Sequence, residues 1–220
     1  APAPERETEL DERLLASPAL ALGQCREVTV KMADCAVQAL RGSLLSVTDY
    51  TPALAEQVRA DEEVTDHYED ILGTYLVKLS SQTLTAADSE NATELLKAIG
   101  DFERIADHAV NIVESAEELQ SKGLTLSEAA QADLKVLEAA VEEILDRSAD
   151  AFRRGDAQAA AAVEPLEQVV DLLKEQLRTR HILRMREGKC SIEAGFVWAD
   201  LLTDLERTSD HCSNIAGCVI

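Results

Sequence analysis

Glycine and proline are scarce in this chain, which argues against loop-rich architectures. The 220 residues include nine Gly and five Pro, roughly half of the ~12% that globular proteins carry. All-β folds need many turns and therefore more of both residues. The sequence is thus predicted to be helical, and its 46% hydrophobic content is sufficient for a packed core.

Positive charge is also in short supply. The chain has 21 Lys and Arg against 42 Asp and Glu, so its formal net charge is −21. Such a field repels nucleic acid and anionic membrane surfaces and attracts cations or basic partners. Nucleic acid is therefore excluded as a ligand.

Paired cysteines and long apolar runs are missing from the sequence. The five Cys are odd in number and contain no C-x-x-C spacing, which favours reduced thiols and a cytoplasmic protein. No apolar run reaches the ~18 residues of a transmembrane segment, and no signal peptide is apparent. The chain starts at Ala1 without Met, so we expect a piece of a longer protein.

Turn and cap residues divide the sequence into six long helical segments. Three of the five prolines lie in the first 18 residues, so residues 1–15 are predicted to form an N-terminal tether. Thr51 followed by Pro52 predicts a helix start, and Thr125 with Glu128 predicts a capping box. The breaks fall near residues 49–52, 84–85, 123–125, 154–156 and 187–189.

An internal repeat organises these segments. The stretch 101–108 (DFERIADH) recurs as 204–211 (DLERTSDH), 103 residues later. Residues 62–66 recur as 167–171 with an offset of 105, which indicates a two-residue difference in a loop. The prediction is an all-α protein of two tandem pseudo-symmetric three-helix bundles with six long helices, with repeats at 16–122 and 123–220.

Apolar residues on the repeated helices recur in alternating steps of three and four, as in bundle seams. The third helix gives Leu95, Ile99, Phe102, Ala106, Ala109, Val113 and Ala116. Acids and amides recur one residue away from the seam positions, which places them roughly 100° round each helix from the seam. They are Glu62, Asp66 and Glu69; Glu103, Asp107 and Asn111; Glu167 and Asp171; and Glu206, Asp210 and Asn214.

Carboxylates beside a bundle seam repel one another, so a cation is expected between them. Oxygen ligands suit hard cations, iron or manganese. In the alternative, Arg104 and Arg207 neutralise a solvated acidic face. His108 and His211 are interpreted as hydrogen-bonding residues at the groove edge, and Arg178, Arg180, Arg184 and Arg186 as a solvated basic patch that could bind a partner or an anion.

The repeated E-R-x-x-D-H-x-x-N motif, with a further E-x-x-x-D on the preceding helix, resembles the PhoU family over nearly the whole chain. The resemblance implies regulation of phosphate uptake without catalysis, and surface metal clusters. One cluster would use Glu62, Asp66, Glu103, Asp107 and Asn111, and the other Glu167, Asp171, Glu206, Asp210 and Asn214. The resemblance implies iron as the first candidate metal, with zinc, manganese, nickel and magnesium as alternatives.

Residues 10–20 and 181–190 resemble more specifically the PhoU-like cytoplasmic tail of bacterial sodium/phosphate cotransporters. This implies a partner in the transmembrane domain of the same protein or in another phosphate transporter component, a place at the inner face of the membrane, and a homo-oligomer as one option. A stand-alone PhoU-type regulator is the alternative. Lys174 stands where the first repeat has Glu69, so the second cluster is expected to bind fewer ions or none.

Two further functions are alternatives to regulation. A di-metal oxidase on a helical bundle uses Glu-x-x-His ligands, and no Glu in this chain has His three residues later. A metal-free helical adaptor would use the net negative charge to select a basic partner. Thermal stability that is insensitive to added metal would favour the adaptor.

Overall fold

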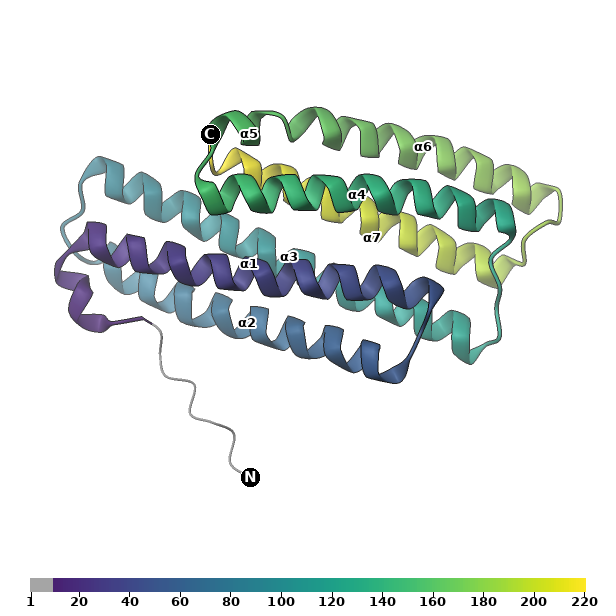
Figure 1. The fold of residues 1–220 in the computed structure, drawn as a ribbon, viewed down its shortest axis with the longest axis horizontal. Coiled ribbons are helices and arrows are strands. Elements are labelled where there is room, and N and C mark those ends of the chain that lie inside the picture. The colour runs from purple at the N-terminus through teal and green to yellow at the C-terminus, as the bar shows by residue number, and fades with distance from the viewer. Residues whose placement is uncertain (1–9) are drawn as a thin grey trace, which may run out of the picture.

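The computed structural model describes residues 10–220, and all regular structure within that range is helical (Figure 1). The elements are η1 (Glu12–Ala16), α1 (Pro18–Thr48), α2 (Pro52–Ser80), α3 (Ala86–Ser121), α4 (Glu128–Arg154), α5 (Ala157–Ala161), α6 (Glu164–Arg186) and α7 (Ile192–Gly217). The predicted all-α class with six long helices is confirmed. None of the helices in residues 10–220 has the length and apolar character needed to span a bilayer.

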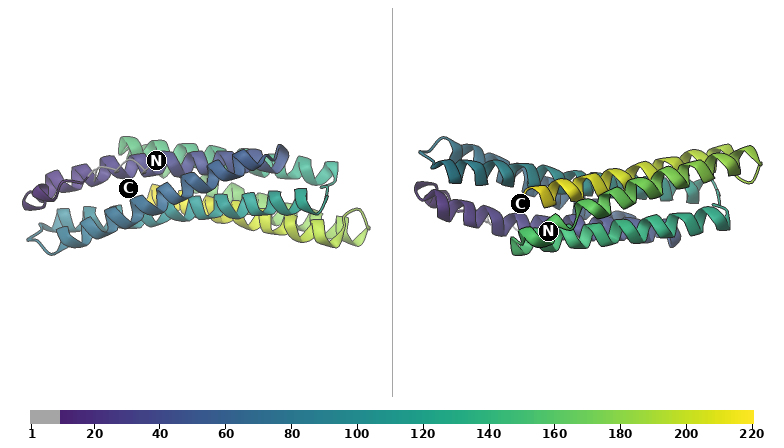
Figure 2. Two further views of the ribbon diagram at one scale, coloured as in Figure 1. Left: turned by 90° about the horizontal axis from the view of Figure 1, so that it is seen from below. Right: turned by 90° about the horizontal axis from the view of Figure 1, so that it is seen from above.

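The helices form two packed groups joined along one interface. Helices α1, α2 and α3 pack on one another, and α4, α6 and α7 form the second group, with α3 against α7 as the main contact between them. Figure 2 shows that the groups are staggered along the long axis, so the molecule is elongated. The seam residues predicted on α3 are all buried. Phe102 on α3 meets Phe152 on α4 edge to face at 5.2 Å, so the core is continuous across the two repeats.

The predicted helix starts have different outcomes. Thr51 accepts a hydrogen bond from the Leu54 amide and Pro52 opens α2, as expected. The capping box at Thr125 was wrong, because Ser127 caps α4 and accepts from the Ala130 amide. Leu126 is buried just before this cap, so the chain is anchored in the core before the helix can begin.

One break was not expected. The segment after Gly155 consists of two helices, α5 and α6, instead of one. Pro165 lies four residues after Ala161, the last residue of α5. A proline removes the amide that would bond to that carbonyl, and its ring clashes with the carbonyl, so the helix ends there and restarts.

Part of the predicted tether packs against the first bundle. Leu10 is buried, and the Tyr75 hydroxyl donates to the Asp11 carbonyl at 2.8 Å. Lys78 pairs with Glu12 at 2.5 Å. The rest of the predicted tether, residues 1–9, lies outside the described residues.

The predicted basic patch on α6 is only partly solvated. Arg184 is 8% exposed, and its Nη1 donates to Asp133 Oδ2 on α4 at 2.6 Å. Arg180 reaches the other Asp133 oxygen at 3.0 Å. The Arg184 guanidinium also lies 5.0 Å from the ring centroid of Trp198 on α7. Interpreting Arg184 as a surface residue was therefore wrong: it ties three helices together.

Replacing Asp133 with Ala should destabilise the fold strongly. The change leaves the buried Arg184 guanidinium without its counter-charge, and breaking a buried pair in this way costs about 3–5 kcal/mol. Urea unfolding followed by circular dichroism measures the loss. The matched control is Asp150→Ala, which breaks an exposed pair with Arg153 and should cost at most about 1 kcal/mol. Equal losses in the two variants would contradict the assignment.

Candidate metal centre

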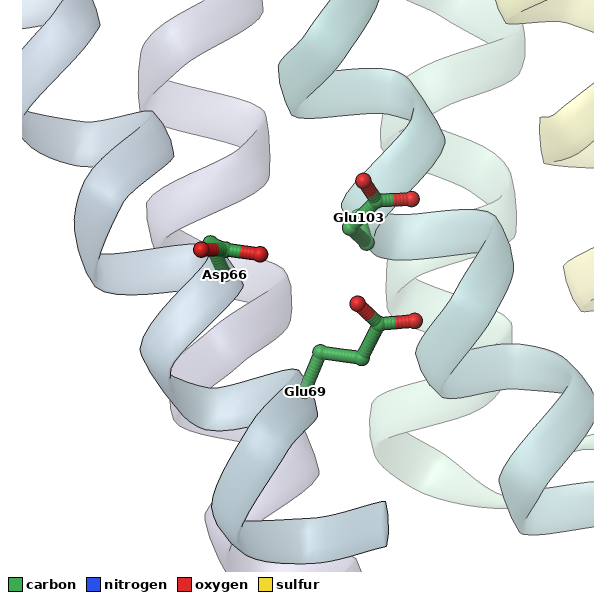
Figure 3. A group of neighbouring side chains, drawn as sticks. All are labelled: Asp66, Glu69 and Glu103. Carbon is green, nitrogen blue, oxygen red and sulfur yellow. The ribbon is translucent and has the colours of Figure 1, made fainter.

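Three carboxylates from two helices meet in the first repeat. Asp66 and Glu69 on α2 and Glu103 on α3 each offer an oxygen, and these oxygens all lie within 4.8 Å of one another. Figure 3 shows the three side chains directed into the space between the helices. We refer to these three residues together with the adjacent Glu62 and Asp107 as the first acidic group.

The bundle seam explains this placement. Thr65 and Phe102 are fully buried on the facing sides of α2 and α3. A turn of roughly 100° per residue brings the next residues, Asp66 and Glu103, to the edge of the same contact. The fold therefore holds the acids together, because separating them would expose the seam.

Burial and mutual repulsion disturb these acids. The pKa of Glu103 is raised to about 7, first by burial and then by the charge of Asp107. Burial also raises the pKa values of Glu62 and Glu69, followed in each case by neighbouring carboxylates. The negative charge of this group is thus unfavourable unless a proton or another cation neutralises it.

Arg104 provides only part of that neutralisation. Its Nη1 donates to Asp107 at 2.9 Å, and its Nε lies 3.4 Å from Glu103. The Arg104 side chain is 61% exposed, so its charge is well screened by water. Five carboxylates and one exposed guanidinium leave the group strongly negative. An all-oxygen donor set of this kind fits hard cations, iron or manganese.

The second acidic group lies between α6 and α7. Glu167, Asp171 and Asp210 each offer an oxygen within 4.8 Å of the others. Burial raises the pKa of Asp210, with Glu206 and Asp171 as the next causes. The pKa of Glu167 is raised by burial and by Asp171. The second repeat therefore also gathers acids between two helices, but its close triad corresponds to Glu62, Asp66 and Asp107 of the first repeat.

Lys174 makes the two groups unequal. Its Nζ donates to Glu206 at 2.9 Å, and both side chains are mostly buried. Glu206 is the repeat partner of Glu103, so the ammonium group engages the carboxylate that corresponds to the centre of the first group. Four carboxylates and one inserted Lys hold less negative charge, which fits the expectation of weaker ion binding there.

Glu69 belongs to the acid stripe of the sequence but was not in the ligand set implied by the resemblance. It lies seven residues after Glu62, and seven residues turn a helix to within about 20° of the starting direction. This spacing was the signal for including it. The structure places Glu69 directly among the candidate ligands.

The two asparagines lie elsewhere. Asn111 Nδ2 donates to Asp204 at 3.2 Å, and Asn214 Nδ2 donates to Asp101 at 3.1 Å. Eight residues separate Asn111 from Glu103, which rotates its side chain about 80° round α3, away from α2 and toward α7. Both candidate amide ligands thus lie in the contact between the repeats.

The histidines join the same contact. His108 Nδ1 lies 2.9 Å from Asp204 Oδ1, and His211 Nδ1 lies 2.8 Å from Asp101 Oδ1. Each repeat therefore supplies a His and an Asn to the Asp of the other, and the two imidazole rings are 5.5 Å apart. The expected hydrogen-bonding role of the histidines is confirmed.

Comparison with known proteins places this arrangement in context. A family model described as the PhoU domain matches residues 29–116 and 134–219. The phosphate-specific transport system accessory protein PhoU homolog of Pseudomonas aeruginosa is 28% identical over 178 residues, covering 80% of this chain and 72% of that protein. The putative inorganic phosphate export protein YjbB of Escherichia coli O157:H7 is 24% identical over 221 residues. That match covers 98% of this chain but 40% of YjbB.

Solved structures share the fold. The crystal structure of PhoU from Pseudomonas aeruginosa matches with a TM-score of 0.84 and 25% identity, covering 90% of this chain and 95% of that one. The PhoU structure from Streptococcus pneumoniae matches with a TM-score of 0.81 and 18% identity, covering 92% and 95%. At that identity the second match supports the fold alone.

Replacing Glu103 with Gln should change how stability depends on pH. A carboxyl pKa raised from 4.5 to about 7 means that the folded state keeps a proton that the unfolded chain releases, so this group lowers stability as pH rises through that window. In chelator-treated protein the variant should melt like the unmodified chain near pH 5. Near pH 8 it should be more stable by about 1–2 kcal/mol.

Thermal unfolding at the two pH values measures this difference. Glu143→Gln removes an exposed acid paired with Arg147 and is the control, with no such gain expected at the higher pH. If Glu103→Gln changed the stability equally at both pH values, the charged form of Glu103 would not be destabilised by its surroundings, which contradicts the prediction.

Proposed function

The chain belongs to the PhoU family, and on that premise we propose that it is a regulatory module of phosphate transport. The observation that carries the proposal is the family match in both halves, over 29–116 and 134–219. It is supported by relatives that are named accessory proteins of phosphate-specific transport systems. The module acts by binding and changing shape, with no catalytic step assigned to it.

The acidic groups would bind metal ions in this scheme. Glu62, Asp66, Glu69, Glu103 and Asp107 would hold ions between α2 and α3, with Glu167, Asp171, Glu206 and Asp210 as the weaker counterpart. Iron is the first candidate, and zinc, manganese, nickel or magnesium would also fit oxygen ligands. A bound ion would offset the repulsion that raises the pKa of Glu103.

Ion binding would then control the stiffness of the first bundle. With the ion present, α2 and α3 are clamped at mid-length. Without the ion, Glu103 either takes up a proton or is repelled by the neighbouring carboxylates. The α2–α3 contact is then weaker. The α3–α7 contact passes such a change to the other repeat, because Asp101 and His108 on α3 bond to His211 and Asp204 on α7.

The partner is a phosphate transporter at the inner face of the membrane, and two arrangements are possible. A stand-alone accessory protein fits the Pseudomonas aeruginosa relative, of which the match covers 72%. A domain attached to its own transporter fits the alignment of nearly the whole chain to 40% of YjbB. The size of the native polypeptide and its membrane fractionation, detected with an antibody to this chain, separate the two.

Deleting these residues from the host genome should uncouple phosphate uptake from phosphate supply. We expect uptake of radiolabelled phosphate to remain high in phosphate-rich medium, where the parent strain reduces it, and a plasmid copy of the chain to restore the reduction. Unaltered uptake and unaltered control in the deletion strain would refute the regulatory role.

Metal content should depend mainly on the first acidic group. Elemental analysis by plasma mass spectrometry of protein purified without chelators should find metal that is mostly lost in Glu103→Ala/Asp107→Ala. Glu206→Ala/Asp210→Ala should lose less, since Lys174 already neutralises Glu206. Lys174→Glu should increase the metal content by restoring the fifth acid.

Glu142→Ala/Glu143→Ala serves as the control, because it removes two acids of α4 outside both groups. Protein that stays free of metal after reconstitution would favour the metal-free adaptor.

A further inference from the structure

We propose that the end of the second bundle where α6 turns into α7 is a docking surface for an anionic phospholipid membrane. We call the exposed residues Arg178, Ile182, Leu183, Arg186, Ile192 and Phe196 the basic apolar tip. The inference is independent of the proposed regulatory function, because it concerns residues outside both acidic groups.

The charge of this segment is opposite to that of the rest of the chain. Residues 174–189 contain six cations, Lys174, Arg178, Arg180, Arg184, Arg186 and Lys189, and only two acids, Glu175 and Glu187. The whole chain has a net charge of −21. Such a local reversal marks a surface that an anionic partner can recognise.

Two of these cations are available to a partner. Arg180 and Arg184 are held by Asp133, Lys174 by Glu206, and Lys189 by Glu187. Arg178 and Arg186 make no ion pair with any residue in 10–220, and both are exposed. They are eight residues apart with Ile182 midway, so the three exposed side chains step round α6 by about 40° each.

Large apolar side chains accompany the arginines. Ile182 is 50% exposed and Leu183 49% on α6, and on α7 Ile192 is 66% and Phe196 67% exposed. The Lys174–Glu206 ion pair and the approach of Met185 to Gly195 fix the antiparallel register of the two helices. That register brings Phe196 level with the Ile182–Met185 turn of α6. The exposed apolar side chains and the two unpaired arginines therefore lie on the last three turns of α6 and the first turns of α7, at the same end of the second bundle.

The position of the tip suits a flat partner. The α6–α7 turn projects at one extreme of the long axis in all three views (Figures 1 and 2). Asp171 of the second acidic group lies 15 residues before Arg186, about 22 Å along the helix. This exceeds two Debye lengths of about 8 Å at physiological salt. The Arg186 end of the tip is therefore screened from the second acidic group, and the exposed acids nearest to it are Glu187 and Glu193 of the turn itself.

A cavity lies beside the tip, and its cations are already paired within the chain. It has a volume of about 340 Å³ and is lined by Arg180, Arg184 and Lys189, by Glu187, and by Leu183, Ser127 and Ala129. Asp133 pairs with both arginines and Glu187 pairs with Lys189, so a phosphate group here would compete with these carboxylates. Helix N-termini and arginines both favour phosphate groups. Isoleucine and phenylalanine side chains next to such a site fit the headgroup–acyl boundary of a bilayer. An acidic soluble partner would not require this convex apolar end.

Flotation with lipid vesicles tests the proposal on the purified chain. The protein should bind vesicles with about 30% phosphatidylglycerol in phosphatidylcholine at about 50 mM salt, and should dissociate at about 300 mM. Pure phosphatidylcholine vesicles should not bind it. Arg178→Gln/Arg186→Gln should weaken partitioning roughly 30-fold, at about fivefold per cation. Ile192→Ser/Phe196→Ser should also abolish stable binding at the lower salt.

Matched controls separate the tip from general effects. Arg13→Gln/Arg147→Gln removes the same charge elsewhere, and Leu20→Ser/Val77→Ser removes apolar side chains of similar exposure from the first bundle. Both should bind vesicles like the unmodified chain, and circular dichroism should show that all four variants are folded. Failure of the unmodified chain to bind anionic vesicles, or equal loss in controls and tip variants, would overturn the proposal.

Discussion

The contact between α3 and α7 is the constraint on which the rest of this structure depends. Each of these helices has three faces with different contacts. One face packs in the core of its own bundle, one carries the acidic residues, and one contacts the other repeat. Because the motif is duplicated, the hydrogen bonds between the repeats are exchanged symmetrically, from His108 and Asn111 to Asp204 and from His211 and Asn214 to Asp101. Rotating either helix would disturb all three sides together.

Much of the architecture could be predicted from the sequence, because seam spacing is a local pattern and the repeat shows that both halves share it. Glycine, proline and cap residues located the principal helix ends. Two of the missed features depended on neighbours distant in sequence, and a third, the break before α6, had a local cause. The burial of Arg184 requires Asp133 on another helix, and the cap at Ser127 reflects the packing of Leu126. The break before α6 was visible in Pro165, whose effect on the preceding carbonyl is local.

The candidate site was predictable to the extent that helix geometry is regular. Residues four or seven apart remain on one side, so Glu62, Asp66 and Glu69 could be grouped from spacing alone. Residues eight apart drift by about 80°, and this is enough to move Asn111 and Asn214 out of the acidic groups. The spacing could not reveal which neighbouring helix each side faces, since that follows from how the two repeats dock.

The replacement of Glu69 by Lys174 gives the second repeat a counter-ion that belongs to the polypeptide, whereas the proposed counter-ion of the first repeat is a free metal ion. A free metal ion occupies a site according to its concentration, whereas an ammonium group on the polypeptide is present at a fixed ratio and cannot diffuse away. The Lys174–Glu206 pair therefore makes the cohesion of α6 and α7 insensitive to supply. In a protein built from two copies of one unit, this single substitution would make one copy a constant reference and the other, if it binds metal as proposed, the conditional half.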